Sequence, residues 1–84
     1  MNRKQRRTLE AILTNPVSAT LIWSDIEALL VAIGCDVIEG NGSRVKFVSN
    51  KLVAAFHRPH PRKEAKEYQV RAVREFLTKL GVKP

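Results

Sequence analysis

The sequence predicts a two-layer α+β domain, in which two helices cover one face of a three-stranded antiparallel sheet, with a further helix at the N-terminus. Three observations lead to this prediction. Apolar residues recur at helical spacing in three segments, runs of β-branched and aromatic residues occupy the middle of the chain, and turn-forming residues separate these runs. Because 84 residues suffice for one hydrophobic core but not two, we expect one functional surface on one domain.

The N-terminal helix is expected over residues 3–14, where Asn15-Pro16 ends it. Its first turn carries a cluster of basic residues, which oppose the helix macrodipole. We therefore expect this turn to fray unless an anion binds it. On this interpretation residues 1–15 are a basic helical arm appended to a domain formed by residues 16–84.

Two further helices belong to the domain itself. The first begins at Ser24, because Ser24 and Glu27 have the spacing of a capping box. The second covers residues 66–80 and ends before Gly81. Each carries one apolar stripe, formed by Ile26, Leu29, Leu30 and Ile33 in the first and by Val70, Val73, Leu77 and Leu80 in the second.

Three short strands lie between these helices, over residues 36–39, 45–49 and 52–57. The strands are close in sequence, so we expect an antiparallel meander. Asn41-Gly42 is typical of a type I′ hairpin turn, because both residues tolerate a positive φ.

Alternation along the strands predicts which side chains share a face. The side chains expected to cover the core are Val45, Phe47, Leu52, Ala54 and Phe56. The opposite face would then display Arg44, Lys46 and His57, three groups able to donate hydrogen bonds to phosphate oxygens. Trp23 is expected to pack at the start of its helix.

The net charge of +7 is unevenly distributed. Residues 1–23 carry +3, residues 24–43 carry −4 and residues 44–84 carry +8. Binding to a phosphate backbone is a common reason for such a concentration, because each neutralised phosphate releases counterions. A purely solubilising charge is the alternative, although solubility requires no such clustering.

The segment from His57 to Lys63 carries the most distinctive chemistry. A polyproline-like path would set His57 and His60 on the same side, about 9 Å apart. Two imidazoles could divide the roles of base and acid in RNA cleavage. Alternatively both are exposed spacers beside prolines that shape a loop. No metal site is expected, because two imidazoles lack a third ligand nearby.

Other function classes find little support in the sequence. The only cysteine, Cys35, cannot form an internal disulfide, which fits a reducing cytoplasm. We find no secretion signal, and the longest apolar run, residues 28–35, is too short to span a membrane. Gly40-Asn41-Gly42 lacks the lysine and the following helix of a phosphate-binding loop. We therefore expect a cytoplasmic protein with no small-molecule cofactor and no membrane partner.

With these features in place, residues 22–82 resemble the HicA family of bacterial toxins. The resemblance rests on the helix at residues 24–30, the turn Gly42-Ser43 leading to Phe47, the stretch Arg58-Pro59-His60-Pro61 and the closing Leu80-Gly81-Val82. It implies a fold similar to that of double-stranded-RNA-binding domains. It also implies cleavage of mRNA without a cofactor, and silencing by a HicB-like antitoxin that covers the active face.

The sequence departs from this family at one position. Members usually have a catalytic histidine directly after Gly42-Ser43, and this chain has Arg44. Arginine can stabilise negative charge on a phosphate but cannot act as a general base near neutral pH. Three alternatives follow: His57 or His60 performs the proton transfer, the protein binds RNA without cutting it, or Arg44 acts electrostatically.

The sequence thus predicts the toxin of a type II toxin–antitoxin system, acting as a metal-independent endoribonuclease (mRNA interferase) with RNA and a HicB-like antitoxin as partners. A non-catalytic RNA-binding module, or a protein-interaction module using the same basic face, is the alternative. The candidate catalytic residues are His57, His60 and Arg44. The candidate RNA-binding residues are Ser43, Arg44, Lys46, Arg58, Arg62 and Lys63.

Overall fold

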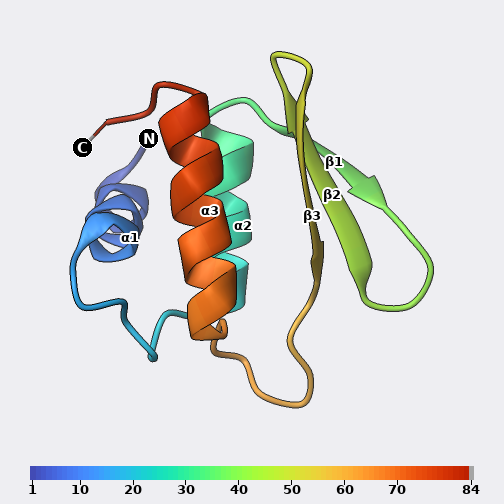
Figure 1. Cartoon of the computed structure of the whole chain (residues 1–84), viewed down its shortest axis with the longest axis horizontal. Coiled ribbons are helices and arrows are strands. Elements are labelled where there is room, and N and C mark those ends of the chain that lie inside the picture. Colours follow the sequence, from blue (N-terminus) through green and yellow to red (C-terminus); the bar gives the residue numbers. More distant parts are fainter. Residues whose placement is uncertain (84) are drawn as a thin grey trace.

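The computed structural model describes residues 1–83, which form six elements in the order α1–α2–β1–β2–β3–α3 (Figure 1). The strands form one antiparallel sheet in the order β1–β2–β3, so β2 is central and the other two are edges. The predicted α+β fold is therefore confirmed. The elements are α1 (Arg3–Leu13), α2 (Trp23–Ala32), β1 (Asp36–Glu39), β2 (Arg44–Ser49), β3 (Leu52–His57) and α3 (Glu67–Lys79).

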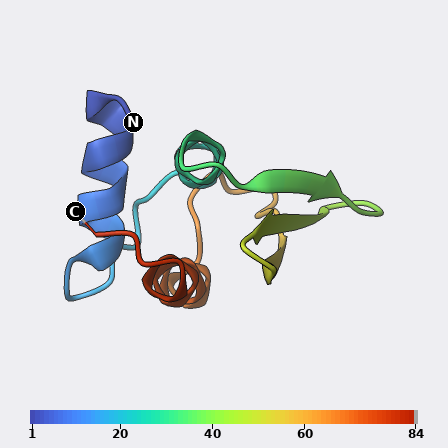
Figure 2. The ribbon, with the colours of Figure 1, turned by 90° about the horizontal axis from the view of Figure 1, so that it is seen from above.

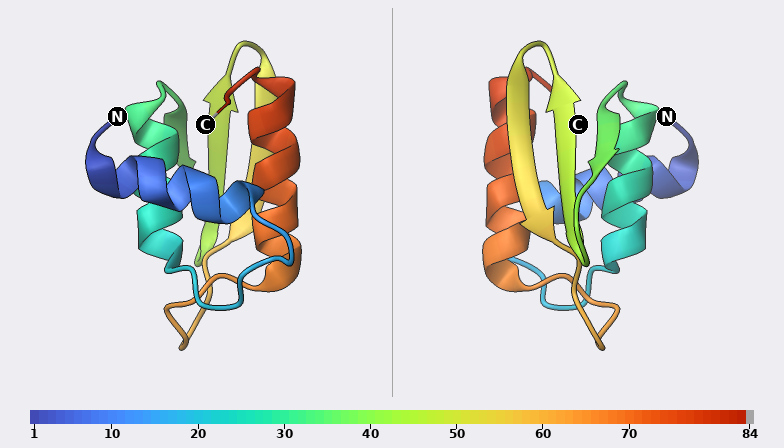
Figure 3. Two further views of the ribbon diagram at one scale, coloured as in Figure 1. Left: turned by 90° about the vertical axis from the view of Figure 1, so that its left-hand side faces the viewer. Right: turned by 90° about the vertical axis from the view of Figure 1, so that its right-hand side faces the viewer.

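The elements are arranged in layers. The two helices α2 and α3 lie side by side against one face of the sheet (Figures 1 and 2). The third helix, α1, crosses them on their outer side, away from the sheet (Figure 3, left). Within residues 1–83 no helix covers the other face of the sheet, which is seen directly in Figure 3, right. That open face is available to a partner.

The core lies between the sheet and the two inner helices, and its composition confirms the predicted alternation of the strands. Val45 and Phe47 are almost completely buried, as is Phe56 on β3. Trp23 packs edge-to-face on Phe56, with ring centroids 5.1 Å apart, so its expected packing role is confirmed. Leu52 and Ala54 are half-buried against this cluster.

The capping box expected at Ser24 does not form. The helix α2 begins one residue earlier, at Trp23, and its cap residue Ile22 makes no side-chain cap hydrogen bond. Backbone hydrogen bonds hold the start of this helix instead. Trp23 N donates to Lys63 O at 2.9 Å, and Ala65 N donates to Leu21 O at 2.7 Å. Long-range pairing of the two segments thus overrides a local sequence pattern.

The type I′ turn expected at Asn41-Gly42 is also wrong. Of these two residues, Gly42 has a positive φ, of 62°, and Asn41 does not. The last paired residues are Glu39 and Val45, and the loop between them is too long for a two-residue turn. The two-residue turn lies in the next hairpin instead. There Asn50 and Lys51 have φ values of 50° and 65°, the left-handed pair that a type I′ turn requires.

The helix α1 is packed as part of the domain rather than as an appended, fraying arm. Its first turn is closed by a capping box between Asn2 and Gln5. Leu9 and Ile12 are buried in the same core cluster as the sheet residues. At its end, the Arg74 guanidinium donates to Ile12 O and to two further oxygens of residues 14–15, all within 2.9 Å. Apolar burial therefore outweighs the unfavourable charges of the first turn.

Candidate functional site

The predicted basic face is formed on the open side of the sheet. In the antiparallel register Arg44 is paired with His57 and Lys46 with Ala55, and directly paired residues point to the same side. Since Val45 between them points into the core, Arg44, Lys46 and His57 are all exposed on the helix-free side. This orientation was predicted from the sequence, and the structure confirms it.

Ser43 joins this group at the end of the β2–β3 pair. Its Oγ lies 3.3 Å from Nδ1 of His57, and its carbonyl accepts a hydrogen bond from Arg58 N at 2.8 Å. Because Nδ1 faces Ser43, Nε2 is the ring nitrogen left to meet a ligand. Arg44, Lys46 and His57 also line a shallow hollow of about 290 Å³. We call Ser43, Arg44, Lys46 and His57 the basic site.

A buried glutamine fixes the strand end that carries His57. Gln69 on α3 is 1% exposed, and its Nε2 donates to the backbone oxygen of His57 at 2.8 Å. Its Oε1 accepts from Lys66 N at 2.9 Å, so both ends of the buried amide have a partner. The last residue of β3 is thereby tied to the start of α3.

Arg58, predicted to bind RNA, is held by two carboxylates. Its guanidinium donates to both oxygens of Glu27 on α2, at 2.7 and 3.1 Å, and to both oxygens of Glu39 on β1, at 2.6 and 2.9 Å. Trp23 Nε1 also donates to Glu27. Hydrogen bonds to Glu39 and then to Glu27 raise the pKa of Arg58 above its usual range. This arginine links three elements, and four of its five N–H donors are used in these hydrogen bonds.

The Arg58–Glu39 bridge makes stability depend on pH in a defined direction. The hydrogen bond from Arg58 lowers the pKa of Glu39 in the folded protein. Its stabilising effect is therefore complete above the unfolded carboxyl pKa of about 4.3, and is lost as the pH falls through the lower folded value. Urea unfolding of wild type and Glu39→Gln should show a stability difference at pH 7 that shrinks below about pH 4. A difference that grows on acidification would contradict this assignment.

The second histidine does not join the basic site. His60 lines a separate hollow of about 440 Å³ together with Arg62 and Lys66. Beyond His60 the chain turns back and pairs with the residue before α2, where Ile22 and Glu64 form an isolated bridge. His57 and His60 thus line different hollows.

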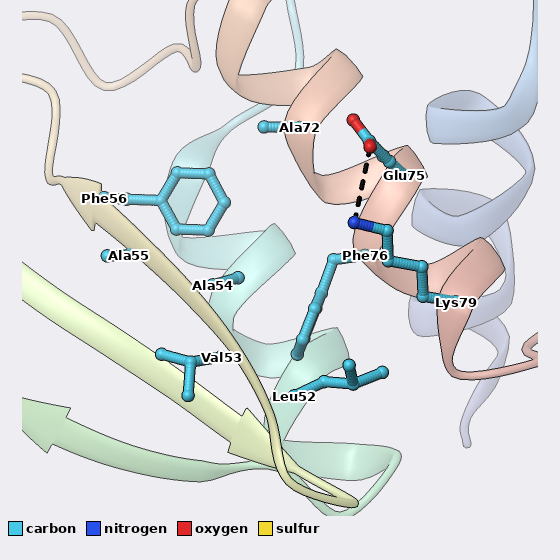
Figure 4. A pocket seen from close by; sticks show the side chains of 9 residues that line it. All are labelled: Leu52, Val53, Ala54, Ala55, Phe56, Ala72, Glu75, Phe76 and Lys79. Carbon is cyan, nitrogen blue, oxygen red and sulfur yellow. Dashed lines mark ion pairs between the residues drawn. The ribbon is translucent and has the colours of Figure 1, made fainter.

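The groove between β3 and α3 contains none of the predicted site residues (Figure 4). Its volume is about 230 Å³. Its walls are mainly alanine, valine, leucine and phenylalanine side chains, and an ion pair between Glu75 and Lys79, at 3.4 Å, lies on its helix side. We therefore do not place the chemistry here.

Within residues 1–83, no group of three or more histidine, cysteine or acidic side chains lies close enough together to hold a metal ion. Cys35 is buried. Its burial, and to a lesser extent the nearby charge of Asp36, raises the pKa of its thiol. Over the same residues, no helix has the length and apolar character that crossing a bilayer requires.

Three residues that shape the site are not recognisable as site residues from the sequence. Glu27 fits a capping-box pattern, while Glu39 and Gln69 match no motif. One signal was present, because Gln69 is a polar residue beside Val70 within an apolar stripe, which suggests a buried hydrogen bond. The partners of Arg58 had no comparable local signal.

Comparison with known proteins identifies the family of this chain. Residues 23–82 match the family model described as the HicA toxin of bacterial toxin–antitoxin systems. The match begins at the first residue of α2, includes the whole sheet and α3, and leaves α1 outside. No curated protein and no solved structure matches the chain. The chain belongs to the HicA toxin family of bacterial toxin–antitoxin systems.

Proposed function

We propose that this protein is a cytoplasmic toxin that cleaves mRNA without a metal ion, and that the basic site holds the scissile phosphate. The observation that carries this proposal is the exposure of Arg44, Lys46 and His57 together on the open face of the sheet. Two cations beside an imidazole match the needs of phosphodiester cleavage, which requires charge stabilisation and proton transfer.

In the proposed reaction, Nε2 of His57 accepts the proton of the RNA 2′-hydroxyl as its oxygen attacks phosphorus. Arg44 and Lys46 donate hydrogen bonds to the phosphate oxygens, where negative charge increases in the transition state. The bond from phosphorus to the 5′-oxygen breaks, and this oxygen takes a proton from water. Arg44 thus replaces the family histidine as an electrostatic group, and His57 supplies the base.

The remaining predicted residues take different roles in this proposal. Arg62 and Lys63 are exposed beyond the end of β3 and would contact phosphates farther along the strand. His60 lies near them and is not the partner of His57 in catalysis. Arg58 stabilises the site without contacting RNA.

The same face also suits a protein partner. Ile38 and Val53 are 51% and 58% exposed, and the register places both on the open face with Arg44 and Lys46. Apolar side chains beside cations favour a protein that is apolar at the centre of its interface and acidic around it. We therefore propose that a HicB-like antitoxin silences this toxin by covering the open face.

The proposal is tested with Arg44→Gln/Lys46→Gln and end-labelled mRNA in EDTA. We expect wild-type protein to cut the RNA and the double variant to be at least about 30-fold slower, because two charge-assisted contacts are lost. The control, Lys51→Gln/Lys79→Gln, removes the same charge elsewhere and should cut normally. If wild-type protein binds the RNA tightly but leaves it intact, the cleavage proposal is refuted. That outcome would favour the non-catalytic alternative, which Arg44 at the histidine position suggests.

A further inference from the structure

The helix α1 presents a second basic surface, far from the basic site. Arg3, Arg6 and Arg7 are exposed, and their spacing of three and four residues sets them on one face of the helix. The buried residues Leu9 and Ile12 occupy the opposite face. In Figure 1 α1 and the sheet lie at opposite ends of the long axis, along which the backbone extends 32 Å. We call these three side chains the arginine face.

The arginine face keeps a net positive charge, because its three arginines have one acidic residue beside them, Glu10, and form no ion pair with it within the part of the chain that the structure describes. None of the three arginines forms an ion pair there, whereas the neighbouring Lys4 pairs with Asp25 at 3.3 Å. Like charges at these spacings, near the positive end of a helix, disfavour the helix. Burial of Leu9 and Ile12 holds it in place, and a bound polyanion would remove the repulsion.

The character of this surface favours nucleic acid over protein. No large apolar side chain of α1 is exposed. The nearest exposed apolar side chain is that of Met1, which precedes the helix. Protein interfaces have an apolar centre, which the arginine face lacks and the open sheet face has in Ile38 and Val53. Exposed arginines with a single exposed apolar neighbour, Met1, instead fit a phosphate backbone, which requires charge and bidentate donors.

We propose that the arginine face binds RNA phosphates as a second surface, and that it and the basic site hold one RNA strand together. The inference rests on the proposed function, since it takes RNA as the ligand. Two linked contacts raise affinity only when the strand is long enough to reach both surfaces. The contribution of α1 should therefore depend on RNA length.

The test compares Arg3→Gln/Arg6→Gln/Arg7→Gln with a matched control, Lys51→Gln/Arg71→Gln/Lys79→Gln. The probes are 2′-O-methyl RNAs of about 30 and about 6 nucleotides, lengths chosen so that only the longer can reach both surfaces. They lack the attacking hydroxyl, so binding is measured by fluorescence anisotropy without cleavage. For the long probe we expect the α1 variant to bind about tenfold more weakly. The slope of log affinity against log salt concentration (the salt slope) should be smaller in magnitude by about 2, because three phosphate contacts are lost. For the short probe we expect little change.

The outcomes separate this inference from the proposed function. Equal affinity and salt slope for the α1 variant and its control would overturn the second surface, as would an equal loss on both probes. If Arg44→Gln/Lys46→Gln alone weakens binding, the proposed function stands and the inference falls. Failure of wild type to bind either probe would refute both. The α1 variant could also bind RNA normally but fail to bind an acidic antitoxin. That result would assign the arginine face to a protein partner and overturn the inference.

Discussion

Substituting His57 with alanine is expected to slow RNA cleavage by about 10²-fold to 10⁴-fold, the usual contribution of a general base. Affinity for uncut RNA should stay within about threefold of wild type, because Arg44 and Lys46 remain in place. Single-turnover cleavage of end-labelled RNA in EDTA measures the rate, and binding to 2′-O-methyl RNA measures the affinity. The separation of these two effects distinguishes a catalytic role from a binding role.

Two further variants define how His57 acts. His60→Ala should cut RNA at close to the wild-type rate, because His60 lines a different hollow. Ser43→Ala should be slower by a smaller factor than His57→Ala, because it removes only the hydroxyl that faces Nδ1 at 3.3 Å. If His60→Ala is the variant that loses cleavage, or if both histidines prove dispensable, the assignment of the base is wrong.

Replacement of Arg58 with methionine is expected to lower the free energy of unfolding by about 2 kcal/mol. Breaking an ion pair in a fully buried core costs more than this. The side chains of Arg58, Glu27 and Glu39 are 19–64% exposed, so water screens part of their charge and the expected loss of stability is smaller. Glu27, the least exposed of the three, would lose both hydrogen bonds from the guanidinium. Urea denaturation at pH 7 measures the change.

Arg58→Lys distinguishes a structural role from phosphate binding. Lysine keeps the positive charge but cannot donate to two carboxylates in a fork, so the lysine variant should recover only part of the stability. If Arg58 bound a phosphate, the methionine variant would show a salt slope for RNA binding lower by about 0.7, and lysine would restore it. We expect an unchanged slope in both variants. A lowered slope with normal stability would contradict the structural role.

The site orientation was predictable because it follows from a local rule. In a strand the side chains alternate, so apolar Val45 and Phe47 at the core place Arg44 and Lys46 outside. The strand bounds followed from the same pattern. For His57, the argument required only that Phe56 point inward, which it does.

Other features depended on contacts that local sequence does not encode. Arg58 meets carboxylates 31 and 19 residues away, and no spacing rule anticipates such partners. The start of α2 is decided by backbone pairing with residues 63–65, which replaces the side-chain cap that Ser24 suggested. A local motif is a reliable guide only where no distant segment competes for the same backbone groups.

The packing of α1 has a practical consequence for any fragment cut at the family boundaries. A recombinant piece of residues 23–82 would keep the sheet and its two covering helices but leave their outer surface bare where Leu9 and Ile12 now pack. Such an apolar patch promotes self-association. Truncation would thus confound solubility with nucleic-acid affinity, whereas charge substitutions on an intact α1 keep the two properties separate.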